Sequence, residues 1–373
     1  MNDRERESCQ SPSIAWEDHI AQENKPDTNG ERQKSSFAPT ISLPKGGGAI
    51  RGIGEKFAAN PVTGTGSMSV PIASSPGRSG FGPQLSLSYD SGAGNGPFGF
   101  GWALGLPQIT RKTDKGLPQY RDAEESDVFI LSGAEDLVPV LVEQSGKWVR
   151  ETLPDRAIGI DTYTIQRYYP RIEGLFARIE RWTREADGDV HWRSISKDNI
   201  LTLYGRDSNS RITDPVDPLR VFTWLICETR DDKGNAILYE YKDEDGVGVD
   251  LTRAHERNRG DRNDPRRATN RYLKRIRYGN RVPLLDDAGQ RPRALTVAQL
   301  QNAGWMFEVV FDYGEHAANA PKPDDVGQWT YRSDPFSSYR AGFEVRTARL
   351  CERALMFHHF PDEAGVGVDC LVR

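Results

Sequence analysis

The hydrophobic pattern from residue 84 to residue 359 consists mostly of short segments in which apolar and polar side chains alternate. Such alternation buries one face of a β strand and leaves the other face in water. Turn-forming Gly, Asn and Asp separate the segments, as in Lys233-Gly234-Asn235 and Gly279-Asn280. Strands are expected at 84–89, 127–131, 137–142, 176–182, 199–204, 220–228, 237–241, 271–278, 305–313 and 343–359. With a short helix at 297–304, the pattern predicts an all-β fold of many short antiparallel strands and hairpins.

The chain divides into two parts by composition. Residues 1–38 are rich in Glu, Gln, Ser, Asn and Lys and hold too few apolar side chains to order themselves, so a disordered polar tail is expected. Residues 39–373 are expected to form one β domain. Hydrophobic residues make up only 36% of the chain, and 36 Gly and 23 Pro supply many turns, which suits strands with one wet face better than a helical bundle.

Charge and hydropathy limit the partners and the route of the protein. The formal net charge of −5 gives no general attraction to nucleic acid. No apolar run reaches the roughly 18 residues that a membrane helix needs, so direct membrane insertion is not expected. Met1–Gln10 is charged and lacks an apolar core, so we expect no conventional signal peptide. The expected location is the cytoplasm before release, and the outside of the cell after release by lysis or a dedicated machine.

A glycine–aromatic segment at residues 92–105 is the most unusual part of the chain. Phe98, Phe100 and Trp102 alternate with glycines that permit tight reversals, and we predict a sharp β corner in which all three aromatic rings pack. The glycines and aromatics of this signature are Gly96, Phe98, Gly99, Phe100, Gly101 and Trp102. Residues 94–99 also fit the G-x-G-x-x-G pattern of nucleotide sites. The residues after them do not favour the helix that such a site requires, so a turn without a cofactor is predicted.

Catalytic and metal-binding patterns are weak. The six histidines are scattered, and the adjacent His358 and His359 should point to opposite faces of a strand, so ordinary half-buried or surface histidines are expected rather than a metal set. The acidic run 243–245 lacks the spacing of a Ca²⁺ loop and is interpreted as a solvated turn. The four cysteines form no C-x-x-C pair and are expected to be reduced, buried thiols. No enzyme is predicted.

The strongest local charge bias lies between Arg253 and Arg281. Eleven basic residues stand there against three acidic ones. Because the first half of the segment is polar and holds no aromatic residues, we interpret it as a solvated insertion or contact loop. An electrostatic docking surface for an acidic polymer or glycan is the alternative.

Several sequence strings resemble the SpvB-type domain of the Salmonella virulence plasmid B family, which also opens the B component of insecticidal Tc toxin complexes. They are residues 99–104, 109–114 and 131–139, and the resemblance extends from residues 41–50 to residues 339–347 and 355–361. A second resemblance, to RHS/YD repeat hairpins, covers about residues 220–282. It rests on Asp231, Gly234, Asn235, Tyr239 and Tyr241. In such hairpins Gly-Asn supplies the turn, and the tyrosines bury their rings with the hydroxyls at the rim.

The resemblance implies a non-catalytic part of a curved, spiralling β shell. In the Tc family, the B component joins a C component to enclose a toxic enzyme, and the shell docks on a pore-forming A component. These two components are the expected partners, and a continuation of the gene product beyond Arg373 is expected. The alternative is the N-terminal targeting or secretion half of an ADP-ribosyltransferase effector whose enzyme domain lies beyond residue 373. A free-standing binding module is a third possibility.

Overall fold

The computed structural model describes residues 56–59, 64–132, 135–172, 174 and 176–372, so the predicted tail at 1–38 lies outside the described residues. Strands dominate the described residues, and α1 (Val297–Gln301) lies in the predicted helical segment, which confirms the all-β prediction. Five 3-10 turns accompany them, at Arg78–Gly80, Asp122–Glu124, Ser208–Ser210, Ala254–Glu256 and Pro265–Ala268. None of the helices in these ranges has the length and apolarity needed to span a membrane.

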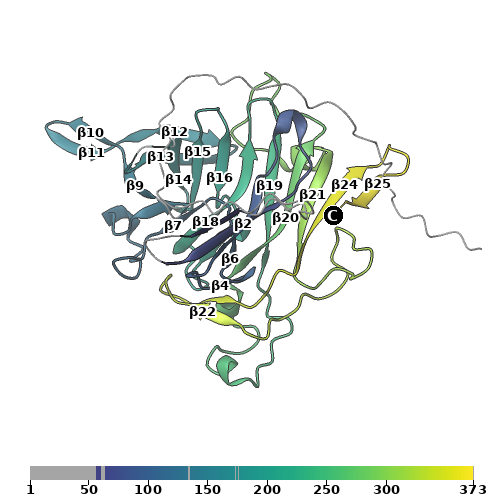
Figure 1. The fold of residues 1–373 in the computed structure, drawn as a ribbon. Coiled ribbons are helices and arrows are strands. Elements are labelled where there is room, and N and C mark those ends of the chain that lie inside the picture. The colour runs from purple at the N-terminus through teal and green to yellow at the C-terminus, as the bar shows by residue number, and fades with distance from the viewer. Residues whose placement is uncertain (1–55, 60–63, 133–134, 173, 175, 373) are drawn as a thin grey trace, which may run out of the picture.

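Eight antiparallel strands close into a barrel on the left of Figure 1. Around the barrel they follow the order β16-β15-β14-β13-β9-β8-β7-β18, and β18 pairs back with β16 to close the ring. Their bounds are β7 (Gln108–Arg111), β8 (Phe129–Leu131), β9 (Glu135–Pro139), β13 (Asp161–Pro170), β14 (Arg178–Arg184), β15 (Val190–Ile195), β16 (Leu201–Tyr204) and β18 (Val221–Arg230). Two more strands, β12 (Thr152–Ile158) and β17 (Arg211–Thr213), pair with β13 and β18.

Aromatic side chains fill the barrel. The rings of Phe129, Trp192 and Trp224 lie 5.0 to 6.0 Å apart in edge-to-face contacts, and all three are buried. Beside the β7–β8 loop, the buried guanidinium of Arg111 lies over the Phe129 ring and bonds to Asp122. An eight-stranded barrel is just wide enough for side chains to fill, and this one is a packed core rather than a pore.

From β18 the same sheet continues as an open antiparallel meander. Its strands are β19 (Ala236–Asp243), β20 (Arg271–Asn280), β21 (Trp305–Asp312), β24 (Arg353–Phe360) and β25 (Gly367–Leu371). Strand β18 serves both parts, because residues 223–225 pair with β7 while residues 228–230 pair with β19. At the far edge, β25 pairs with β24 alone among the described strands.

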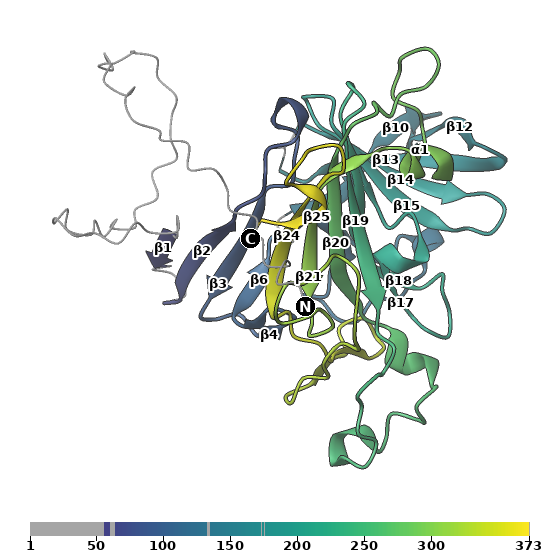
Figure 2. The same cartoon turned by 90° about the vertical axis from the view of Figure 1, so that its right-hand side faces the viewer.

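A second, four-stranded sheet lies against the meander (Figure 2). It consists of β1 (Lys56–Ala59), β2 (Gly66–Ile72), β3 (Leu85–Asp90) and β6 (Trp102–Leu104). The loop between β2 and β3 is hydrogen-bonded to the meander: the Ser75 carbonyl accepts from the Tyr278 hydroxyl, and the Ser75 hydroxyl bonds to His358, both at 2.7 Å. Leu85 belongs to the same buried cluster as Tyr278 and the barrel aromatics, so one core runs through all three parts.

Two predicted strands each turn out to be two. The prediction for 137–142 covers β9 and the start of β10 (Leu141–Gln144), which forms a projecting hairpin with β11 (Lys147–Arg150). The prediction for 343–359 covers β23 (Val345–Thr347), which pairs with β22 (Phe336–Ser338), and then β24. Between β23 and β24 the chain carries Arg349, which is fully buried and binds Glu244. The other predicted strands overlap observed ones.

Candidate functional site

The glycine–aromatic segment forms a small hairpin, β4 (Asn95–Gly96) and β5 (Gly99–Phe100), followed by β6. Gly101 has a φ of +80°, and a Cβ there would come within 2.5 Å of the Tyr89 ring, so the position requires glycine. A strand follows the hairpin where a nucleotide site would need a helix N-terminus. The segment is therefore a tight structural corner, and its geometry is not that of a phosphate-binding loop.

The three aromatic rings of this corner have different environments. The ring centres of Phe98 and Phe311 are 6.1 Å apart in an edge-to-face arrangement. The ring of the half-buried Trp102 has its centre 5.2 Å from that of Tyr89. Phe100 is 64% exposed, so the prediction that it packs with the other two is wrong. The positive φ values of Gly99 and Gly101 turn the chain on both sides of Phe100, so the strand alternation assumed for the three rings does not hold.

The turn between β18 and β19 is organised by Asp231. Its carboxylate accepts hydrogen bonds from the backbone N–H of Asn235 (2.8 Å) and from the Asn235 side chain (2.6 Å). Gly234 has a φ of +80°, as the turn chemistry predicts. Asn280, which the sequence indicated only as a turn residue, is fully buried and donates to the Gly234 carbonyl at 2.8 Å. The repeated Gly-Asn pair at 234–235 and 279–280 was the available signal.

Tyr239 and Tyr241 do not keep their hydroxyls at a rim. Burial raises the pKa of Tyr239 to about 12, and the Tyr241 hydroxyl donates to the Ile226 carbonyl at 2.9 Å inside the fold. The expected rim position is therefore wrong. The likeness of these hairpins to RHS/YD repeats stays a prediction.

One group of metal-ligating side chains comes together among the described residues: Glu315, His316 and Asp325, with ligand atoms within 4.8 Å of one another. The Lys274 ammonium bonds to all three, at 2.7 Å from His316 Nε2 and 2.9 Å from Asp325 Oδ1. A protein cation therefore occupies the position that a metal ion would take. His316 is 6% exposed, which corrects the expectation of half-buried or surface histidines.

The segment between β19 and β20, here called the insertion (residues 244–270), is built around Glu256. This carboxylate, 1% exposed, accepts hydrogen bonds from Arg259 (2.8 Å), Arg267 (2.5 Å), Tyr331 and Arg346 (both 2.8 Å). Burial alone would raise the pKa of Glu256, but these hydrogen bonds lower it to about 2. The predicted solvated insertion is wrong for the buried Arg267 and for the half-buried Arg259.

The prediction that the acidic run 243–245 is solvated is confirmed for the exposed Asp243 and Asp245 but is wrong for Glu244. Glu244 is 3% exposed, and its Oε2 accepts a hydrogen bond from Arg349 Nε at 3.0 Å. The Arg349 guanidinium also lies 4.2 Å from the Trp329 ring centre. Buried charges are tolerated when they are paired and hydrogen-bonded in this way.

Cys227 and Cys351 carry free thiols, as predicted for reduced cysteines. Burial raises the pKa of each thiol to about 12. Because the thiolate is the nucleophile, neither residue is prepared for covalent catalysis. Cys9 lies outside the described residues.

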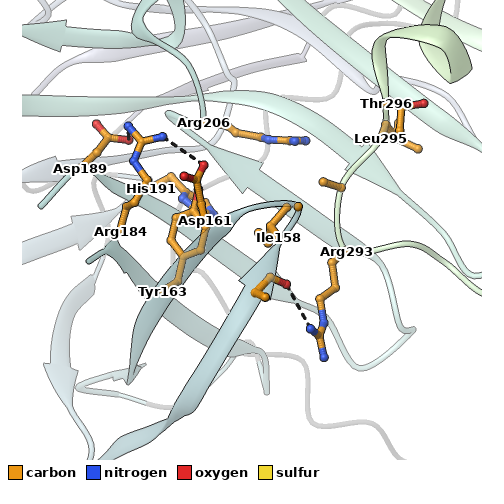
Figure 3. A pocket seen from close by; sticks show the side chains of 13 residues that line it. Ile158, Asp161, Tyr163, Arg184, Asp189, His191, Arg206, Arg293, Leu295 and Thr296 are labelled. Atoms are coloured by element: carbon orange, nitrogen blue, oxygen red, sulfur yellow. Dashed lines mark hydrogen bonds and ion pairs between the residues drawn. The ribbon is translucent and has the colours of Figure 1, made fainter. Parts of the chain in front are cut away.

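A cleft of about 540 Å³ opens on the outer face of the barrel (Figure 3). One wall is the turn between β12 and β13 with the adjoining strands β14 and β15, and the other is the segment 293–296 that leads into α1. Its charged lining residues are Asp161, Arg184, Asp189, Arg206 and Arg293, with His191, Tyr163 and Leu295 beside them. We refer to this feature as the cleft.

His191 lines the cleft and is only 3% exposed, so it is another buried histidine. Burial, followed by the charges of Arg193, Arg206, Arg211 and Arg184, lowers its pKa well below the ordinary value and keeps the ring neutral. Arg193 Nε donates to His191 Nε2 at 3.1 Å. The ring proton of the neutral imidazole therefore lies on Nδ1.

Comparison with known proteins identifies the relatives of this fold. Residues 60–360 match the family model described as Salmonella virulence plasmid 65kDa B protein. The mono(ADP-ribosyl)transferase SpvB of Salmonella choleraesuis (strain SC-B67) is 37% identical over 328 residues, and that of Salmonella typhimurium is 36% identical over 327 residues. Each alignment covers 87% of this chain and 51% of the relative, so the chain spans about half the length of these curated relatives.

Solved structures give the same result. The N-terminal domain of effector protein SpvB from Salmonella typhimurium strain LT2 matches with a TM-score of 0.66 and 36% identity, over 81% of this chain and 92% of that chain. TcdB2–TccC3 matches with a TM-score of 0.71 and 34% identity, and the match covers 89% of this chain and 15% of that chain. The Photorhabdus luminescens Tc holotoxin pore matches with a TM-score of 0.70 and 33% identity, and the match covers 91% of this chain and 15% of that chain. The resemblance read from the sequence strings is thereby confirmed.

Proposed function

Because the chain belongs to the family of the Salmonella virulence plasmid 65kDa B protein, we propose that it is a non-catalytic shell part of a toxin B component. Together with a C component it encloses a toxic enzyme, and the shell docks on a pore-forming A component. The protein acts outside the cell that makes it, after leaving the cytoplasm. It serves virulence and binds neither nucleic acid nor a membrane directly.

The observation that carries this proposal is the match to TcdB2 in complex with TccC3, which extends over 89% of this chain at 34% identity. A match of that extent covers most of the chain rather than one motif, and 15% of the longer chain, which supports a role as one segment of a larger protein. The buried thiols and the Lys274-filled acidic group are consistent with a scaffold that performs no chemistry.

The exposed sheet edge at β25 also supports the proposal, because a further strand could pair with it and extend the sheet. Val368 and Leu371 are exposed there, at 59% and 36%. An exposed apolar edge strand readily pairs with a further strand. In the proposed shell, that strand comes from the remainder of the assembly.

The second candidate is the N-terminal half of an ADP-ribosyltransferase effector, which the 37% identity to the Salmonella choleraesuis transferase favours. The two candidates differ in what accompanies this domain in the complete gene product. Further Tyr-Asp repeats and a propeller fit the shell, whereas a Ser-Thr-Ser strand with a Glu-x-Glu motif fits the transferase.

Co-expression of the complete gene product with its cognate C component tests the proposal. We expect the two to purify together and to form a closed hollow particle in electron micrographs. Val368→Lys on β25 should reduce particle yield, since a charge at an edge opposes strand addition. Val216→Lys, at a loop residue that is 78% exposed, is the matched control and should assemble normally. Failure of the unmodified proteins to associate would contradict the shell function.

A further inference from the structure

The cleft has two chemically different sides. On the side of β14 and β15, Arg184 donates to both oxygens of Asp187 (2.9 and 2.8 Å), and Arg211 holds Asp189. Asp161 has only a long contact of 3.5 Å with Arg184 and is 36% exposed. The positive charges on this side are therefore already neutralised, and Asp161 keeps free capacity to accept hydrogen bonds.

The opposite side carries positive charge that the protein neutralises only in part. Arg206 is 31% exposed, and its nearest carboxylate, Glu228, lies 3.6 Å away and is also paired with Arg230. Within the described part of the chain, the side chain of the exposed Arg293 donates to one backbone oxygen, that of Ala157 at 3.1 Å. Figure 3 shows Arg206 reaching across the opening toward the segment that carries Leu295.

A third arginine lies directly behind this side. Arg193 is 4% exposed and donates to His191 Nε2 and, at 3.2 Å, to the Arg293 carbonyl; both of these residues line the cleft. Its Nη2 is buried without a hydrogen-bond partner in the described part of the chain. Burial and the charges of Arg206 and Arg230 lower the pKa of Arg193 to about 9, as expected where positive charge is in excess.

We propose that the cleft binds a small acidic polyol, such as a sugar phosphate or a sugar acid. The phosphate or carboxylate lies against Arg206, and Arg293, whose guanidinium points away from Arg206 in Figure 3, turns from the Ala157 carbonyl to reach it. The planar donors of arginine match oxyanions. The hydroxyl groups donate to Asp161 on the other side. A volume of about 540 Å³ exceeds what an inorganic ion needs and lies in the range of small-molecule sites. This inference does not rest on the proposed shell function.

Isothermal titration calorimetry of the 373-residue chain tests the site, with glucose 6-phosphate, glucuronate, inorganic phosphate and glucose as probes. We expect both acidic sugars to bind more tightly than phosphate or glucose. Arg206→Gln and Arg293→Gln should each weaken acidic-sugar binding roughly tenfold or more, the usual loss for a charged hydrogen bond. Arg257→Gln, at an exposed arginine of the insertion, is the matched control and should leave binding unchanged.

Three results would overturn the proposal: no binding of either acidic sugar at millimolar concentration, equal binding by Arg206→Gln and the control, or phosphate binding as tightly as glucose 6-phosphate. Thermal unfolding of each variant shows that it is folded. If Arg206→Gln is destabilised through the loss of its contact with Glu228, Arg293→Gln carries the test, because Arg293 forms no ion pair with a carboxylate of the described residues.

Discussion

The barrel and the insertion are both well buried, but they bury opposite kinds of side chain. In the barrel, the rings of Phe129, Trp192 and Trp224 contact one another edge to face. In the insertion, the buried centre is the carboxylate of Glu256, with arginines around it. Apolar packing tolerates small shifts of a ring, whereas a buried carboxylate is stable only while its partners stay in place.

This contrast suggests a division of roles. The barrel holds its shape through a closed ring of strands around a core in which aromatic rings pack against one another. The insertion reaches its shape by binding residues on other segments, such as Arg346 in β23 and Tyr331 before β22. The ion pairs of the insertion therefore connect it to the separate β22–β23 hairpin and the residues next to it. The insertion and this hairpin both lie below the meander strands (Figures 1 and 2).

The largest effect is expected from Trp224→Ala in the barrel. The side chain is 1% exposed, contacts Phe129 and Trp192, and donates from Nε1 to the Val190 carbonyl at 2.9 Å. Its removal should lower the free energy of unfolding by about 3–5 kcal/mol, measured by urea denaturation. Trp148→Ala, at a tryptophan that is 69% exposed, is the control. Similar losses in both variants would show that the barrel core does not carry the stability.

Glu256→Gln tests the insertion in the same way. The amide keeps the shape of the side chain but leaves Arg259, Arg267 and Arg346 without their shared negative charge. The free energy of unfolding should therefore fall by about 3 kcal/mol. Limited proteolysis should then cut within 244–270 before it cuts the barrel. Asp324→Asn, whose side chain is 93% exposed, should leave both measurements unchanged. If the protease cut the insertion equally slowly in Glu256→Gln and in the unmodified chain, the idea that Glu256 holds the insertion together would be wrong.

Much of the fold could be predicted because strand alternation is a local property. The meander strands β19, β20 and β21 were each predicted close to their observed positions. Closure of the barrel could not be predicted, since it depends on pairing between β7 and β18, which lie more than a hundred residues apart; Thr110 pairs with Thr223. The break between β23 and β24 was missed, and Arg349 within it binds a distant partner, Glu244.

The site was harder to predict, because its important residues are buried charges. Arg267, Glu244 and Lys274 look like solvated residues in a hydropathy pattern, yet all three are buried. Their partners stand 11, 105 and 41 residues away, at Glu256, Arg349 and Glu315. The turn at Asp231 was predictable because the spacing of Asp, Gly and Asn is itself local.

The glycine corner offers a smaller and sharply paired test. Gly101→Ala puts a Cβ within 2.5 Å of the Tyr89 ring at a φ of +80°. The free energy of unfolding, measured by heat or urea, should therefore fall by about 1–3 kcal/mol. Gly94→Ala, in the same segment, has open space around its Cβ and a φ outside the positive range, so it should be nearly neutral. Equal effects would mean that glycine content, rather than the geometry at Gly101, fixes the corner.

The smallest expected effect is a pH dependence confined to the insertion. The pKa of Glu256 is lowered from its ordinary 4.5 to about 2, so its contribution to stability is complete above pH 4.5 and is lost as the pH falls through 2. The difference in unfolding free energy between the unmodified chain and Glu256→Gln should therefore be constant near neutral pH and shrink steadily in acid. Urea denaturation at pH 7, 4 and 3 measures it. Trp224→Ala removes no titratable group, so its difference from the unmodified chain should stay level over the same range. If the Glu256→Gln difference also stayed level, the carboxylate charge would not be what holds the insertion together.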